Sequence, residues 1–165
     1  MKNKGFSLVE LIIVIAIMAI LAAAIAPALI RYIDKSRRGD DVQAAATINT
    51  AVTATLANED AYDEVATLMT GSNVIASANA HPTTGTAVFQ APTGRSSFLA
   101  DLNSNLGNEA PKIKYTKNFG GAAPTGYSWE VLVSESGKPI VGLNVTGGAH
   151  AGSYQLQPSI HPSYK

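Results

Sequence analysis

A long apolar segment near the start of the chain limits what this sequence can fold into more than any other feature. It runs from Phe6 to Ile30, reads FSLVELIIVIAIMAILAAAIAPALI, and contains one charged residue, Glu10. The uncharged part after Glu10 is about twenty residues long, which as a helix spans roughly the 30 Å of a hydrocarbon core. We therefore predict a membrane-spanning helix.

The five residues before this segment, MKNKG, are polar and end in Gly5. In a secretory signal peptide the small-residue cleavage site follows an apolar region of about 7–15 residues. Here the small residue comes first, and the apolar region is long enough to span a bilayer. The order favours an anchor that is retained after processing.

The size and composition exclude several classes of protein. The 165 residues leave room for one membrane helix and one compact domain of about a hundred residues. Twelve basic and twelve acidic residues give a formal net charge of zero, which offers no reason to expect a nucleic-acid partner. The absence of cysteine excludes disulfides, thiolate metal sites and cysteine nucleophiles.

The helix is expected to continue beyond the apolar segment. The next residues, RYIDKSRRGDD, contain no turn cluster, and the lone Gly39 costs a helix only about 1 kcal/mol. Asp34 with Arg38, and Arg37 with Asp41, have the i,i+4 spacing of surface ion pairs. Further on, apolar residues recur every three or four positions and predict a face packed on a sheet: Val42, Ala45, Ile48, Val52 and Leu56.

Two short helices are predicted after the long helix, which spans Phe6–Leu56. The first is capped by Asn58 and reaches Met69, before Gly71. The second covers Ser97–Leu106, with Ser96 or Ser97 as its N-cap and Gly107 after its C-terminus. Between them we predict a loop over Ser72–Ala87 and a short strand at Ala87–Gln90.

The C-terminal third has the period-two pattern of β-strands. Tyr127–Val133 alternates cleanly, Ser134–Lys138 forms a hairpin loop, and Ile140–Val145 returns as the partner strand. Ile113 with Tyr115, and Ser153–Leu156, are further strand candidates. The pattern predicts an α+β fold in which three or four antiparallel strands pack on the amphipathic part of the long helix.

The N-terminal residues KGFSLVELIIVIAIMAILAAAIAP resemble the start of type IV prepilins and pseudopilins. The resemblance lies in a glycine before an aromatic residue, a glutamate four residues later and a proline near the end of the apolar run. It implies that a prepilin peptidase cleaves between Gly5 and Phe6, and that the new amino group of Phe6 is methylated.

The resemblance also implies an architecture, a location and a set of partners. Residues 1–5 would be a cleaved leader, 6–30 the transmembrane and filament-core half of the helix, 31–57 its amphipathic half, and 58–165 a pilin-like β-sheet head. The precursor would span the inner or cytoplasmic membrane once, with its head outside. A separate assembly ATPase would polymerise it into an extracellular helical filament for adhesion, motility or biofilm formation. No cofactor, nucleic acid or enzymatic activity is expected.

Glu10 and Pro27 are the candidate assembly residues. A carboxylate in a membrane span costs several kcal/mol unless it is paired, so Glu10 either pairs with the amino group of Phe6 on a neighbouring subunit or is stabilised by the helix dipole at its own N-terminus. Pro27 removes one backbone donor and is expected to kink or locally open the helix. The resemblance implies that the helix around Pro27 loses helicity when the filament assembles. The alternative is that the membrane helix tolerates Pro27 and that the proline has no such role.

Four basic residues follow the apolar segment: Arg31, Lys35, Arg37 and Arg38. By the positive-inside rule they outweigh the two lysines of residues 1–5 and place the C-terminal part in the cytoplasm. Long domains cross regardless of flanking charge, and the resemblance implies a head outside. The cluster itself is either a solvated helix face in salt bridges or a contact for lipid headgroups.

Departures from the family pattern distinguish its branches. Many pilins of Gram-negative bacteria have a disulfide that closes a C-terminal loop, which this chain cannot form. In this respect it is similar to some Gram-positive, clostridial-type pilins, which also lack it. No acidic residue follows Glu135, so the acidic calcium loop usual in major pseudopilins is missing. The alternatives within the family are a pseudopilin or minor pilin of a type II secretion or DNA-uptake system. The alternative from another class is a membrane-anchored extracellular binding domain or enzyme.

No side chains in the predicted head have the spacing of a catalytic or metal site. The histidines His81, His150 and His161 are scattered and lack a ligand spacing such as HxxxH. Trp129 and Tyr127 lie on one face of a predicted strand and are expected in the core.

Overall fold

The computed structural model describes residues 6–69, 73–82, 85–91, 94–116, 124–148 and 151–164. Gly5 with the rest of the predicted leader, Gly71 and His150 lie outside the described residues. The described elements are the helices α1 (Leu8–Thr55), α2 (Glu59–Ala66) and α3 (Ser96–Asn105), the strands β1 (Val74–Asn79), β2 (Gly126–Val133), β3 (Pro139–Thr146) and β4 (Gly152–Gln157), and the 3-10 helix η1 (Pro162–Tyr164).

The long helix α1 confirms the predicted continuous helix. It has 48 residues and passes through both Pro27 and Gly39. The chain divides into two compact units, Met1–Ser36 and Arg37–Lys165, and α1 contributes to both. In the first unit every side chain from Phe6 to Ile33 is exposed. By length and composition α1 is apolar enough to cross a membrane.

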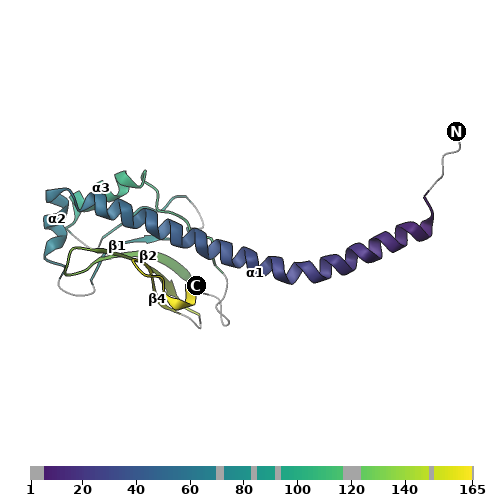
Figure 1. Ribbon diagram of the computed structural model, residues 1–165. Coiled ribbons are helices and arrows are strands. Elements are labelled where there is room, and N and C mark those ends of the chain that lie inside the picture. The colour runs from purple at the N-terminus through teal and green to yellow at the C-terminus, as the bar shows by residue number, and fades with distance from the viewer. Residues whose placement is uncertain are drawn as a thin grey trace. The chain divides into compact units, whose positions relative to one another are not determined.

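In the second unit α1 is amphipathic and packs into the head. Apart from the adjacent pair Ala51 and Val52, its buried residues recur every three or four positions, so they form one stripe along the helix: Asp41, Ala45, Ile48, Ala51, Val52 and Thr55. The apolar members of this stripe belong to the same core cluster as the buried residues of the sheet. Figure 1 shows this half of α1 running along the sheet, with α2 and α3 near its C-terminal end.

The sheet has four antiparallel strands in the order β1-β2-β3-β4. The hairpin between β2 and β3 is the one predicted: Ser134 N donates to Lys138 O at 2.9 Å, and Gly137 has a φ of 74°. Every second residue of β2 from Trp129 onward is buried, as the period of two predicts. Trp129 is fully buried and its Nε1 donates to Pro111 O at 2.6 Å.

Three of the predicted strand and loop assignments were wrong. Val74–Asn79 was expected to lie in a loop but forms β1, whose register shifts between Val74 and Ala76 and so breaks the alternation that marks a strand. The predicted strand Ala87–Gln90 makes only an isolated bridge. Ile113 and Tyr115 lie outside the strands, although both are buried.

The short helices follow the prediction in position but not in every boundary. Asn58 caps α2 by accepting from Asp60 N at 3.1 Å, but this helix ends at Ala66, earlier than predicted. The N-terminus of α3 has no serine cap. Instead the carboxylate of Glu64 in α2 accepts from Ser97 N at 3.1 Å and from Phe98 N at 2.9 Å, which satisfies two free donors of α3.

Candidate functional site

The N-terminus of α1 carries the first candidate site. Phe6, which precedes the helix, is 85% exposed. The hydroxyl of Ser7 accepts from Val9 N at 3.4 Å, and the carboxylate of Glu10 reaches back to Ser7 N at 2.9 Å. This is a capping box, in which a serine at the N-cap and a glutamate three residues later satisfy donors at the start of a helix. The Ser-x-x-Glu spacing was readable in the sequence, but we had not predicted this role.

The capping box gives Glu10 a partner within its own chain. The hydrogen bond to Ser7 uses Oε2 of the carboxylate. A negative charge in the first turn also interacts favourably with the helix dipole. The structure therefore shows local stabilisation of Glu10, as one of the two interpretations expected. The pairing of Glu10 with Phe6 of a neighbouring subunit stays a prediction.

Pro27 lies inside α1 without ending it. Because proline has no N–H, the carbonyl of Ala23 lacks its helical donor at this turn. The helical assignment continues on both sides of Pro27. The single chain thus keeps its helix here, and a loss of helicity on assembly stays a prediction.

The residues between these two positions present a continuous apolar surface. Large apolar side chains are exposed on every side of the helix; Leu8, Ile20 and Ile25, for example, are 74%, 70% and 59% exposed. An exposed apolar surface of this kind is unfavourable in water and marks a site that contacts lipid or protein. The first unit is therefore built to be covered by something outside the chain.

A second cluster of polar residues lies in the head around Asp41. This side chain is fully buried, where we expected a surface ion pair with Arg37. Its Oδ1 accepts from Lys114 N at 2.6 Å, and its Oδ2 accepts from Tyr115 N and from the hydroxyl of Tyr164, both at 3.1 Å. Burial raises the pKa of the Asp41 carboxyl, while these three hydrogen bonds act in the opposite direction.

Arg38, one turn before Asp41, belongs to the same cluster. Its Nη2 donates to the hydroxyl of Tyr115 at 2.9 Å, and its Cζ lies 4.5 Å from the centroid of that ring. The ring of Tyr115 in turn meets the ring of Tyr164 edge-on, with centroids 6.2 Å apart. Arg38 is thus half-buried in the head, which corrects the interpretation of this residue as part of a solvated or lipid-binding face.

The cluster connects three distant parts of the chain. Asp41 and Arg38 come from α1, Tyr115 from the segment after α3, and Tyr164 from η1. Burial and the nearby Asp41 carboxyl raise the pKa of the Tyr164 hydroxyl, in line with its role as a proton donor to Asp41. In a chain without cysteine, this cluster fastens the C-terminal residues to the helix.

The fold and the N-terminal segment together define a class of protein. A capped, exposed apolar helix that continues into an α+β head built on a small antiparallel sheet is the arrangement of a pilin-like subunit. Within the described residues, no group of three or more His, Cys, Asp and Glu side chains is arranged to hold a metal ion.

Comparison with known proteins agrees with this class. Residues 1–26 match the family model described as the prokaryotic N-terminal methylation motif. Fimbrial protein Q of Moraxella bovis is 36% identical over 124 residues, which cover 67% of this chain and 73% of that protein. No solved structure gives a significant match. The chain belongs to the type IV pilin family, which confirms the resemblance seen in the sequence; the clostridial type stays a prediction.

Proposed function

We propose that this type IV pilin subunit polymerises through residues 6–30 of α1 into an extracellular filament for adhesion, motility or biofilm formation. The observation that carries the proposal is the exposure of every side chain from Phe6, just before α1, to Ile33 within it, in a helix that begins with a capping box. The head, by contrast, has its own buried core. The subunit thus has one surface that needs partners and one domain that folds around itself.

The apolar half of α1 serves twice in this proposal. In the precursor it spans the inner or cytoplasmic membrane once, with the head outside. A prepilin peptidase then cleaves between Gly5 and Phe6, and the new amino group is methylated. Assembly by machinery with a separate ATPase exchanges lipid for the same helix in neighbouring subunits. The subunit itself is structural and has no enzymatic role.

In this proposal Glu10 makes the contact between the helices of neighbouring subunits specific. The α-amino group of Phe6, freed by cleavage, is positively charged and would be buried with the apolar helices in the filament core. A buried charge needs an opposite charge and hydrogen bonds to be tolerated. The carboxylate of Glu10 on a neighbouring subunit would supply both, in addition to the bond that it already makes to Ser7 in its own chain.

The capping box allows a sharp test of this role. Glu10→Gln keeps a side chain that can cap the helix but removes the charge, whereas Glu10→Leu removes both. We expect both variants to be cleaved and inserted normally and to form no filaments. Electron microscopy of sheared surface material, with mass spectrometry of the mature N-terminus, measures both properties. Normal filaments from Glu10→Gln would show that Glu10 acts as a cap and not as an ion-pair partner.

Processing has its own test. Gly5→Leu should leave an uncleaved precursor, because the residue before the new N-terminus would then be bulky. Mass spectrometry should find a start at Phe6 in the native protein and at Met1 in the variant. A native protein that also starts at Met1 would contradict the proposed maturation.

Pro27 is proposed to permit local opening of α1 on assembly. Hydrogen exchange on filaments should find faster exchange in residues 22–27 than in either flanking stretch, because the missing donor weakens this turn. A filament map with an intact helix across these residues would remove the proposed role. The same filaments would distinguish a major pilin, which forms most of the fibre, from a minor pilin or pseudopilin.

A further inference from the structure

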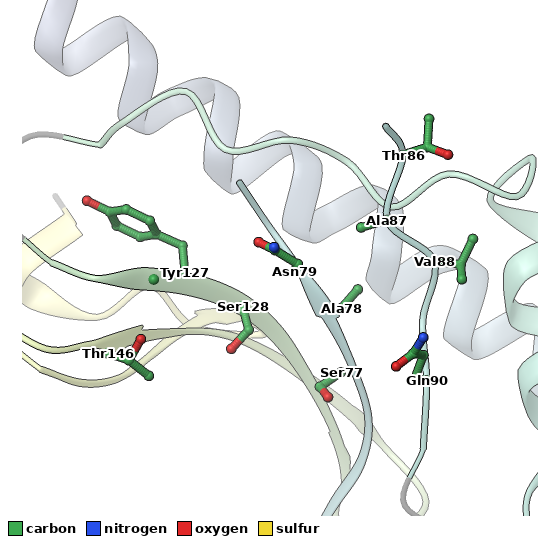
Figure 2. Close-up of a pocket in the computed structure, with 11 residues that line it drawn as sticks. Ser77, Ala78, Asn79, Thr86, Ala87, Val88, Gln90, Tyr127, Ser128 and Thr146 are labelled. Atoms are coloured by element: carbon green, nitrogen blue, oxygen red, sulfur yellow. The ribbon is translucent and has the colours of Figure 1, made fainter. Parts of the chain in front are cut away.

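A polar pocket opens in the head where two extended segments separate. Ser77 of β1 and Gln90 exchange both of their backbone hydrogen bonds, each 2.8 Å long, but this bridge is isolated. Beside the bridge lies a pocket of about 400 Å³. It is lined by Ser77, Ala78, Asn79, Thr86, Ala87, Val88, Gln90, Gly126, Tyr127, Ser128 and Thr146. Figure 2 shows the residues of the strands on one side and those of the neighbouring segment on the other.

The lining of this pocket is polar but carries no formal charge. Five of its side chains are hydroxyls or an amide that make no hydrogen bond to another described residue: Ser77, Thr86, Gln90, Ser128 and Thr146. Each of these groups can both donate and accept. The lining also includes Tyr127 and Val88, which contribute apolar atoms.

The walls of the pocket are held by contacts that do not use these five side chains. The amide of Asn103 in α3 accepts from Phe89 N at 2.8 Å and donates to Phe89 O at 3.0 Å, and the ring of Phe89 is buried. On the opposite wall, the hydroxyl of Tyr127 donates to Thr116 O at 2.9 Å. Because both walls are fixed from behind, the site is formed before a ligand arrives, which lowers the entropic cost of binding.

Gly126 keeps space at one end of the pocket. A Cβ atom built at this position would lie 2.8 Å from the hydroxyl oxygen of Thr146. Any larger residue would therefore push this hydroxyl out of its place in the lining. The local sequence thus leaves room where an ordinary strand residue would fill it.

We propose that this pocket binds a neutral saccharide. A ligand with many hydroxyl groups and no charge matches a lining that both donates and accepts hydrogen bonds and contains no cation or anion. Charged ligands would find no counter-charge in the lining, and apolar ligands would leave these polar groups unpaired. The volume lies in the usual range for small-molecule sites. The pocket consists of head residues alone, so binding does not depend on filament assembly.

The test uses the full-length protein in zwitterionic detergent micelles, because maltoside and glucoside detergents would themselves offer a neutral sugar. Lactose is titrated while backbone amide shifts are followed by NMR, and sialyllactose serves as its anionic counterpart. We expect saturable shifts at Ser77, Val88, Gln90 and Ser128 with lactose. The sialylated sugar should bind at least several-fold more weakly, because the lining offers no counter-charge to its carboxylate.

Two variants separate this pocket from general surface effects. Gln90→Leu and Ser128→Leu remove polar groups from the lining, and we expect each to weaken lactose binding about tenfold. Gln43→Leu makes the same chemical change on the exposed face of α1, outside the pocket, and should bind like the native chain. Failure of lactose, maltose and N-acetyllactosamine to shift these amides would overturn the proposal, as would equal weakening by Gln43→Leu. If a short extended peptide produced these shifts and the sugars did not, the proposal would also be overturned. The pocket would then be a site where a peptide strand pairs with the sheet.

Discussion

The two halves of α1 belong to one uninterrupted helix, but their apolar side chains have opposite surroundings. From Leu8 to Ile33 every side chain is exposed and nearly every one is apolar. From Asp41 to Thr55 the helix is amphipathic, and its buried stripe is covered by the head of the same chain. Both halves therefore share the same helical backbone. They differ in whether the rest of the chain covers their apolar side chains.

This difference shows which properties of the subunit are intrinsic and which depend on its surroundings. The stability of the head comes from contacts within residues 37–165, so substitutions there should be felt in the isolated chain. The first half of α1 has no such cover within the described residues, and in the proposed function lipid or other subunits supply it. Substitutions there should change insertion and assembly and leave the head intact.

The largest effect is expected from a matched pair of isoleucines. Ile48 is fully buried, and Ile48→Ala should lower the free energy of unfolding of the head by about 2–5 kcal/mol because it leaves a cavity. Ile20 is 70% exposed, and Ile20→Ala should leave this free energy unchanged. The fluorescence of Trp129, the single tryptophan of the chain, reports unfolding of the head in both variants. Equal destabilisation by the two changes would contradict the division of α1.

A somewhat smaller effect is expected at Asp41. Asp41→Ala leaves the buried N–H of Tyr115, the part-buried N–H of Lys114 and the hydroxyl of Tyr164 without their acceptor. At about 1–3 kcal/mol for each donor that stays unpaired, we expect a loss of about 2–4 kcal/mol. The neighbouring Asp40 is exposed, and Asp40→Ala is expected to change stability by less than about 0.5 kcal/mol. Denaturant unfolding followed at Trp129 measures both. A stable Asp41→Ala head would show that this cluster does not fasten the C-terminal residues.

Two helix caps offer a finer comparison. Asn58→Ala removes the cap of α2 and should destabilise the head by about 1 kcal/mol. Ser7→Ala removes the hydroxyl of the capping box at α1, a similar local change, but should leave unfolding of the head unchanged because Ser7 lies in the other unit. Thermal unfolding in micelles compares the two, and a lower melting temperature for Ser7→Ala would contradict the independence of the units.

The smallest effects are expected in the titration of two head carboxylates. Burial raises the pKa of Asp41 above 3.8, so its contribution to stability is full below that value and falls as the pH rises through the raised pKa. The backbone N–H groups of Phe98 and Ser97 lower the pKa of Glu64 below 4.5, so its contribution is present above 4.5 and is lost as the pH falls through the lowered pKa. Carboxyl carbon NMR should find these opposite shifts. Tyr164→Phe should raise the pKa of Asp41 further, and a lower value would contradict the assigned hydrogen bond.

Local patterns in the sequence were enough to predict much of the fold. The long helix, the β2–β3 hairpin and the Asn58 cap were predicted because their signals are periodicity, turn residues and capping residues within a few positions of one another. The predicted edge strand at Ser153–Leu156 is present as part of β4. The methylation motif at the N-terminus is local in the same sense.

The remaining features depend on partners that are distant in the chain. The serine caps predicted for α3 were wrong because Glu64, more than thirty positions earlier, already supplies the acceptor. In the sequence, Asp41 has the pattern of a surface carboxylate. Its donors at Lys114, Tyr115 and Tyr164 are distant in the chain and meet it only in the folded head. The strand β1 was missed because its register shift places Ile75 and Ala76 both in the core and so hides its alternation.

The bond between Tyr164 and Asp41 has a consequence for the order in which this protein is made. The two residues are 123 positions apart, so Asp41 leaves the ribosome long before the hydroxyl that completes its set of donors. Before η1 is synthesised, the helices and strands of the head can pack together, but the hydrogen bond from Tyr164 to Asp41 cannot form. A chain that has not yet produced η1 therefore carries a buried carboxylate that lacks one of its three donors.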